Sequence, residues 1–167
     1  MSGAVSDSSV LIHLAAIGRL ALLKCYYDEV IVPPAVWREV VEQGGVRYGV
    51  TEVIAARDAG WIRIVSPQDP SRVETFEQDL HSGESESIVL ALELHPDVIL
   101  LDESEARRIA RICHLPITGC IGILLQAKED HKIRSIRAEM GRLQRKGNFW
   151  ISKSLYRQIL MQEGVKE

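Results

Sequence analysis

The sequence contains few cysteines, and they form no recognisable pairs. Three cysteines occur in 167 residues, and none stands in a Cys-x-x-Cys pair. A small, odd number of cysteines without such a pair argues against a zinc site and against a disulfide framework. Cys25, Cys113 and Cys120 lie in apolar surroundings, and we expect them to be buried free thiols. The histidines are not placed at metal-ligand spacing either.

The chain also lacks long apolar runs and a large excess of charge of one sign. No apolar run approaches the roughly 20 residues that span a membrane, and the N-terminus lacks the basic region and apolar core of a signal peptide. We therefore expect a cytoplasmic protein. The net charge is only −3, which excludes a generic basic protein that coats nucleic acid. A nucleic-acid partner would need a local basic patch.

The composition is that of one folded domain. Of the residues, 46% are hydrophobic, and we find no internal repeat, low-complexity segment or linker. A chain of this length can bury a real core. We expect a single domain over residues 1–167, with a C-terminal helical extension over about residues 134–167.

Short β-branched runs alternate with amphipathic helical stretches. The predicted strands are residues 4–6, 30–32, 61–65, 98–101 and 116–118. The predicted helices are residues 9–16, 19–27, 35–42, 50–59, 72–80, 84–94, 104–113, 121–130, 136–145 and 152–163. Such alternation is typical of an α/β fold with a central parallel sheet, here of about five strands.

Four acidic residues occupy positions that this fold would bring together. Asp7 ends the first strand, Asp102 follows the fourth, and Glu39 and Glu86 lie in helical stretches. Right-handed crossovers put the carboxyl ends of the strands at one edge of the sheet, where α/β proteins do their chemistry. Carboxylates held close together repel one another. The usual reason to hold them there is a hard cation such as Mg²⁺ or Mn²⁺, so metal-assisted phosphodiester hydrolysis is our leading hypothesis.

Each of these acids, taken alone, also has a purely structural explanation. Asp7 and the Asp102-Glu103 pair are suited to cap helices, and glutamates such as Glu39 and Glu86 are common on solvated helix surfaces. The combination, in this order, favours the functional interpretation.

Further polar residues accompany the four acids. Ser8 and Ser9 are placed to orient a carboxylate, and Glu84 and Glu103 are candidates for support of the site. Arg107 and Arg111 are four residues apart on one predicted helix, so they share a face that could bind RNA phosphates. A solvated basic face is the alternative.

Four segments together resemble the PIN-domain nucleases. Residues 5–12 have the strand, aspartate, hydroxyl residues and apolar helix with which PIN domains begin. Residues 30–39 are similar to the family's strand, proline, helix and glutamate. Residues 83–91 look like the helix that carries its third acidic residue, and residues 98–102 look like the strand that ends at its fourth. The resemblance implies a three-layer α/β/α fold and a metal-dependent ribonuclease. In that enzyme Asp7, Glu39, Glu86 and Asp102 would be catalytic residues and ligands of Mg²⁺ or Mn²⁺.

Finer details resemble a prokaryotic subgroup related to VapC-like toxins of toxin–antitoxin pairs. These details are a Gly-Glu-x-Glu helix at residues 83–86, a Thr-Gly-x-x-Gly-x-Leu segment at residues 118–124 and a Phe-Trp-Ile-Ser segment at residues 149–152. The resemblance implies an RNA substrate and, for a toxin, a small antitoxin as protein partner. The third acid is Glu86 where many relatives have aspartate, and Glu103 replaces a frequent second aspartate.

Two other functions are weighed against the nuclease. A HAD-type phosphatase needs a second aspartate two residues after the first, and Ser9 occupies that place. The stronger rival is a catalytically weak PIN-like binding module that acts through a protein partner.

Apolar and aromatic residues are plentiful in two segments, residues 20–27 and 149–160. This is more apolar surface than a five-stranded core requires, so we expect a homodimer. The alternative is that the C-terminal segment packs back onto its own domain.

Overall fold

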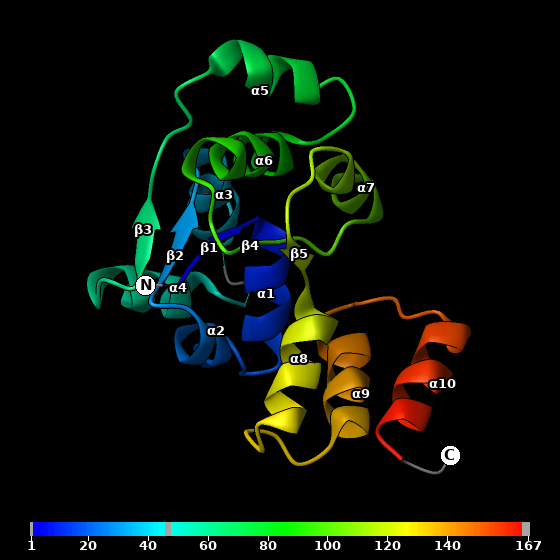
Figure 1. The fold of residues 1–167 in the computed structure, drawn as a ribbon. Helices are drawn as coiled ribbons and strands as arrows, with labels where there is room; N and C mark the ends of the chain where they lie inside the picture. Colours follow the sequence, from blue (N-terminus) through cyan, green and yellow to red (C-terminus); the bar gives the residue numbers. More distant parts are fainter. Residues whose placement is uncertain (1, 46–47, 165–167) are drawn as a thin grey trace.

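A five-stranded, fully parallel sheet forms the centre of the protein (Figure 1). The computed structural model describes residues 2–45 and 48–164. The strand order is β3-β2-β1-β4-β5. The bounds are β1 Gly3–Ser6, β2 Glu29–Val32, β3 Ile62–Ile64, β4 Val98–Leu100 and β5 Ile117–Thr118. The predicted α/β class, parallel sheet and number of strands are confirmed.

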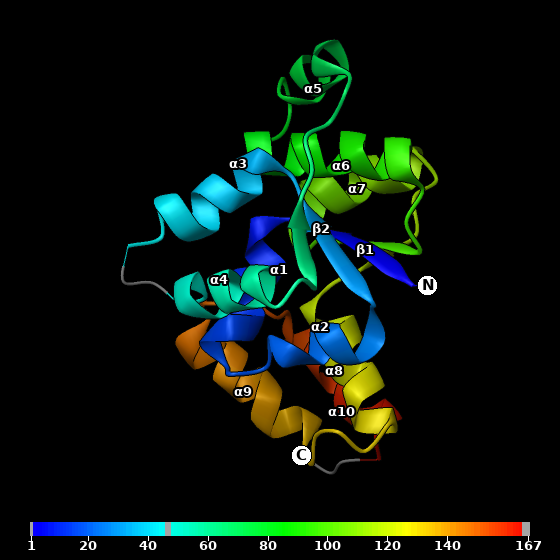
Figure 2. The same cartoon turned by 90° about the vertical axis from the view of Figure 1, so that its left-hand side faces the viewer.

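Helices cover both faces of the sheet, which gives three layers (Figures 1 and 2). Their bounds are α1 Ser8–Ala16, α2 Ala21–Tyr26, α3 Pro34–Trp37, α4 Val50–Asp58, α5 Pro70–Phe76, α6 Ser82–Leu94, α7 Ser104–Ile112, α8 Cys120–Glu129, α9 Ile136–Lys146 and α10 Lys153–Gln162. A π-helical turn, η1 (Arg38–Glu42), continues α3. The helices lie close to their predicted ranges, except that α5 begins and ends earlier than predicted.

Alternating strand residues divide the core into two parts. On β1, Ala4 packs into a cluster with α1, α8 and α9, whereas its neighbour Val5 packs into a cluster with α6 and α7. The period of two follows from the geometry of a strand. Because both faces are covered, the interior strand β4 is apolar throughout, as in other parallel sheets, whereas the edge strand β3 carries the exposed Arg63.

The cysteines do not all behave as predicted. Cys120 is fully buried and Cys113 is half-buried, but Cys25 is exposed. On α2, Leu22 and Leu23 are buried in the core, whereas Cys25, near the end of this short helix, is exposed to solvent. The prediction of three buried thiols is therefore wrong for Cys25.

The C-terminal helices add to the core on the side of α1 and α8. Ile136, Met140 and Leu143 of α9 and Ile159 and Leu160 of α10 are buried in the same cluster as α1. The tail thus packs back onto its own domain and uses much of the apolar surface that suggested a dimer. Trp150 and Met161 remain exposed, and the homodimer stays a prediction. Among the described residues, no helix combines the length and apolar character needed to cross a bilayer.

A buried ion pair joins this extension to the end of α1. The side chain of Glu139 on α9 is 5% exposed and accepts hydrogen bonds from Arg19 Nε and Nη2 at 3.1 and 2.5 Å, and from Arg142 Nη1 at 3.3 Å. The two arginine side chains are about a third exposed, so they can turn to water if Glu139 is lost.

We predict that Glu139→Ala lowers the free energy of unfolding by about 2 kcal/mol, because it removes a hydrogen-bonded buried charge whose partners stay partly solvated. The melting temperature should fall by roughly 4–8 °C for a domain of this size, measured by calorimetry. Glu74→Ala, at an exposed position on α5, is the control and should change little. Equal melting temperatures for the two variants would contradict the role given to Glu139.

Candidate functional site

Asp7 is a buried carboxylate at the carboxyl end of the central strand β1. The residue is 1% exposed and forms the N-cap of α1, where Oδ1 accepts from Val10 N at 3.1 Å and Oδ2 accepts from Ser9 Oγ at 2.8 Å. Burial, followed by the negative charge of Asp102, raises the pKa of Asp7 well above its ordinary value. Among the described residues no cationic side chain pairs with Asp7. A bound cation would supply the missing counter-charge.

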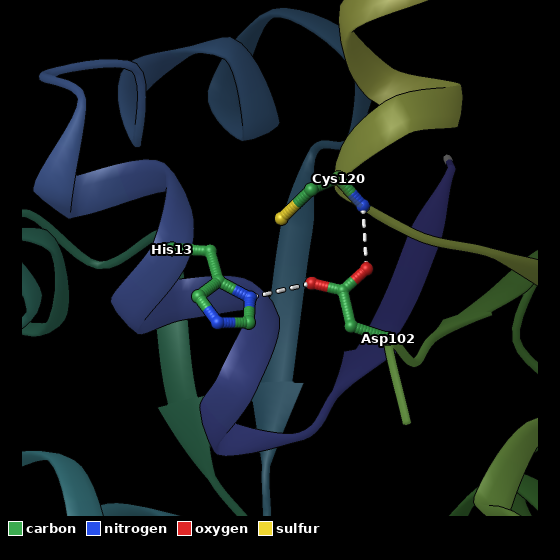
Figure 3. A group of neighbouring side chains, drawn as sticks. All are labelled: His13, Asp102 and Cys120. Carbon is green, nitrogen blue, oxygen red and sulfur yellow. Dashed lines mark hydrogen bonds and ion pairs between the residues drawn. The ribbon is translucent and has the colours of Figure 1, made fainter. Parts of the chain in front are cut away.

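Asp102 follows β4, the neighbour of β1, and both of its oxygens are held. Oδ1 accepts from Cys120 N at 2.9 Å, and Oδ2 lies 2.9 Å from His13 Nδ1 (Figure 3). Gly119 makes this approach feasible, because a Cβ there would lie 2.5 Å from Asp102 Oδ1. His13, Cys120 and Gly119 therefore fix the orientation of the carboxylate.

An acidic cleft of about 570 Å³ lies between α1, η1 and the start of α6. Its acidic lining residues are Asp7, Glu39, Glu84 and Glu103. Glu39 enters from η1, and its Oε2 accepts from Ser8 Oγ at 2.5 Å. Gly83 leaves room for it, because a Cβ there would lie 2.8 Å from Glu39 Oε1. Asp102 lines a second cavity beside the cleft, and Glu103 lines both.

Glu84 and Glu86 lie on the same helix but have different surroundings. Glu84 lines the cleft, and burial, with smaller contributions from Glu103 and Glu39, raises its pKa. Glu86 does not line the cleft; its Oε2 accepts from Ala35 N at 2.9 Å and so satisfies a backbone donor at the start of α3. Two residues apart on a helix, the side chains point in different directions. Of the two, Glu84 lines the cleft with Asp7, whereas Glu86 contacts the start of α3.

The predicted supporting residues fall into two groups. Ser8 and Ser9 donate to Glu39 and Asp7 respectively, as expected of residues that orient carboxylates. Arg107 and Arg111 lie beside the second cavity instead, near Asp102.

Sequence reasoning missed His13. His13, Asp102 and Cys120 form one group whose ligand atoms all lie within 4.8 Å of one another, and no other such group of three occurs among the described residues. His13 lies one helical turn and a half after Asp7 on α1. Residue spacing in the sequence could not identify His13, because its partner Asp102 is 89 residues away in the chain.

The chemistry of this group does not suit a soft metal ion. Burial, followed by the charge of Asp102, raises the pKa of the Cys120 thiol well above its ordinary value, whereas metal binding needs the thiolate. His13 Nδ1 and Asp102 Oδ2 are hydrogen-bonded to each other, so these two atoms already satisfy one another. Among the described residues, no three carboxylates of the acidic cleft have oxygens that all lie within 4.8 Å of one another, which suits a hydrated hard cation that takes some ligands directly and others through water.

We predict that Glu84→Gln and Glu86→Gln have different effects on Mn²⁺ binding. Glu84→Gln removes a charge from the cleft and should weaken Mn²⁺ binding about ten-fold or more in calorimetry. Glu86→Gln keeps an oxygen that can accept from Ala35 N and should bind Mn²⁺ as the wild type does. The opposite order of affinities would restore Glu86 as the ligand.

Comparison with known proteins agrees with this architecture. A family model described as a PIN domain matches residues 3–164. A search of curated proteins found no match. The matched range contains all five strands, the acidic cleft and both C-terminal helices. This protein therefore belongs to the PIN-domain family, whose members are generally metal-dependent nucleases.

Proposed function

We propose that this protein is an endoribonuclease that depends on Mg²⁺ or Mn²⁺. One observation carries the proposal: Asp7 is buried beside two other carboxylates and has no cationic partner among the described residues. Such an arrangement is costly unless a cation binds there. The family supports a nuclease in general terms, and RNA as the substrate rests on the resemblance and on the arginines near Asp102.

Asp7, Asp102, Glu39 and Glu84 are the residues that we propose to hold the cation. When bound, a divalent cation lowers the pKa of its water and stabilises negative charge on a scissile phosphate. Glu103, at the junction of the cleft and the second cavity, is placed to support the site. We assign Glu86 to the start of α3.

The chain itself supplies the rigid positioning of these carboxylates. Ser9 and the Val10 amide hold Asp7, and Ser8 holds Glu39. His13 and the Cys120 amide hold Asp102. Each carboxylate oxygen has lone pairs left to bind a cation after it accepts one hydrogen bond. The acids are thus oriented before the cation arrives, which is what a hydrolytic site requires.

The resemblance to VapC-like proteins extends the proposal to a toxin role. The supporting features are the Gly-Glu-x-Glu and Phe-Trp-Ile-Ser segments. The partner would then be a small antitoxin protein. Expression of the chain in cells with and without a neighbouring small gene tests this, since a toxin slows growth only when the antitoxin is absent.

We predict that Asp7→Asn and Asp102→Asn each abolish RNA cleavage while the protein stays folded. Asparagine is nearly isosteric and still caps α1, but it removes the charge that binds the cation. Cleavage of a labelled single-stranded RNA with Mn²⁺ is the measurement, and circular dichroism checks the fold. Glu74→Gln, at an exposed position on α5, is the control and should cleave normally. Undiminished cleavage by either aspartate variant, or in excess EDTA, would contradict the proposal and favour the binding module.

We also predict that Asp7→Asn raises the melting temperature of the metal-free protein at neutral pH. The pKa of Asp7 is raised in the folded state, so folding costs free energy once the carboxyl ionises. This cost is absent below the unfolded pKa of about 3.9, grows as the pH rises and is complete above the folded pKa. The difference in melting temperature between Asp7→Asn and the wild type should therefore become smaller as the pH falls toward 4. A gain that is constant with pH would show that the charge is not its cause.

A further inference from the structure

A cavity of about 680 Å³ lies beside the acidic cleft, and most of its lining residues have no role in the proposed hydrolysis. His13 and Asp102 line this cavity, and Glu103 lines both spaces. One part of its wall comes from α7 and another part from the segment that joins α9 to α10. Figure 1 shows that segment (orange) leaving α9 and running past the start of α8 toward α10. The cavity therefore shares Glu103 with the acidic cleft and Asp102 with the proposed cation ligands.

The wall formed by α7 is basic. Arg107 and Arg111 line the cavity, and Arg107 is held in place because its Nη1 donates to Leu101 O at 2.7 Å. Within the described part of the chain, the Arg111 guanidinium has no ion pair or hydrogen bond. Arg108, on the same helix, is instead paired with Glu105 at 2.6 Å and does not line the cavity. The two cations on the cavity side are thus available to an anionic ligand.

The part of the wall between α9 and α10 is aromatic. Trp150 lines the cavity and is 82% exposed, the highest value among the exposed large hydrophobic residues described. Its neighbours hold it there: Ile151 is buried in the core, and Phe149 packs against the core and meets the His13 ring edge-on at 5.0 Å between centroids. An indole anchored on both sides and left open to solvent is a ready surface for a planar ligand.

A third part of the lining carries little side-chain bulk. Gly119 and Gly122 form it, at the start of α8. A Cβ at Gly119 would lie 3.0 Å from Arg107 Nη1, and a Cβ at Gly122 would lie 2.2 Å from Thr118 Oγ1. Larger residues would therefore displace Arg107 or Thr118, and the glycines keep the cavity open.

We propose that this cavity binds one unpaired nucleotide of a single-stranded RNA, with its base stacked on Trp150 and its phosphate beside Arg107 and Arg111. The proposal rests on the ribonuclease function proposed above. Aromatic side chains that stack bases, combined with arginines that contact phosphates, are the general means by which proteins bind single strands. A base in a duplex is already stacked and paired, so it cannot lie flat on Trp150.

Charge favours RNA over a protein segment as the occupant. A protein docked on an aromatic surface would need acidic residues to meet two arginines, whereas every RNA nucleotide carries both an aromatic base and a phosphate. Asp102 also lines the cavity, so a strand bound there would pass beside a proposed cation ligand. The nucleotide in the cavity would therefore lie next to the scissile phosphate.

The test measures binding separately from cleavage. Fluorescence anisotropy of a labelled single-stranded RNA is recorded in EDTA, with the same oligonucleotide annealed to its complement as comparison. We expect Trp150→Ala to weaken single-strand binding about ten-fold or more, the size of one lost base stack, and Trp150→Phe to restore most of it. Met161→Ala, at an exposed apolar residue of α10, is the matched control and should bind normally.

The arginines give a second, independent readout. Arg111→Gln should weaken binding and lower the slope of log K against log salt concentration by about 0.7, the value for one phosphate contact on a single strand. Arg108→Gln should leave the slope unchanged. RNA binding that is equal for the wild type, Trp150→Ala and Arg111→Gln would overturn the proposal, as would equal affinity for the duplex and the single strand.

The two proposals fail in different ways. If RNA binding depends on Trp150 but no metal-dependent cleavage is found, the nucleotide site is supported and the ribonuclease function is contradicted. If cleavage depends on metal but RNA binding does not depend on Trp150 or Arg111, the ribonuclease function stands and the nucleotide site is wrong. This wall would then contact another ligand, such as a protein partner.

Discussion

The repulsion among carboxylates at one edge of the sheet is the constraint on which the rest of the site depends. Asp7 ends the central strand β1 and Asp102 follows the neighbouring strand β4, so the parallel sheet itself brings their charges together. Asp7 is buried, and the charges of Asp102 and Glu84 add to the cost of its ionisation. A fold does not gain stability from such an arrangement. The arrangement makes physical sense as a site that is complete only with a cation.

Much of the surrounding structure holds these charges in place. A serine hydroxyl and a backbone amide bind Asp7, a second serine binds Glu39, and His13 and the Cys120 amide bind Asp102. Gly83 and Gly119 allow the close approach of α6 and α8 to these carboxylates. The same network reaches the second cavity, because His13 contacts both Asp102 and Phe149. The proposed catalytic and nucleotide-binding regions are therefore linked by direct contacts.

The sequence was sufficient for the fold and for part of the site. Alternation of apolar strands with amphipathic helices determines the parallel sheet, and strand ends determine where Asp7 and Asp102 lie. The sequence could not predict which of Glu84 and Glu86 lines the cleft, because both lie in the first turns of one helix. Only the tertiary contact of Glu86 with Ala35 distinguishes them. The pairing of His13 with Asp102 and the exposure of Cys25 likewise depend on how helices are rotated about their axes, which short helices with few apolar residues specify weakly.

The central claim is that Asp7 and Asp102 share a hard cation at the edge of the sheet. A crystal structure of crystals soaked in Mn²⁺, with anomalous diffraction measured near the manganese absorption edge, tests this directly. We expect an anomalous peak beside Asp7 and Asp102, at the edge of the acidic cleft that Glu39 and Glu84 line, and no peak in Asp7→Asn crystals. No peak in the wild-type cleft at saturating Mn²⁺, or a peak coordinated by Cys120 and His13 alone, would contradict it.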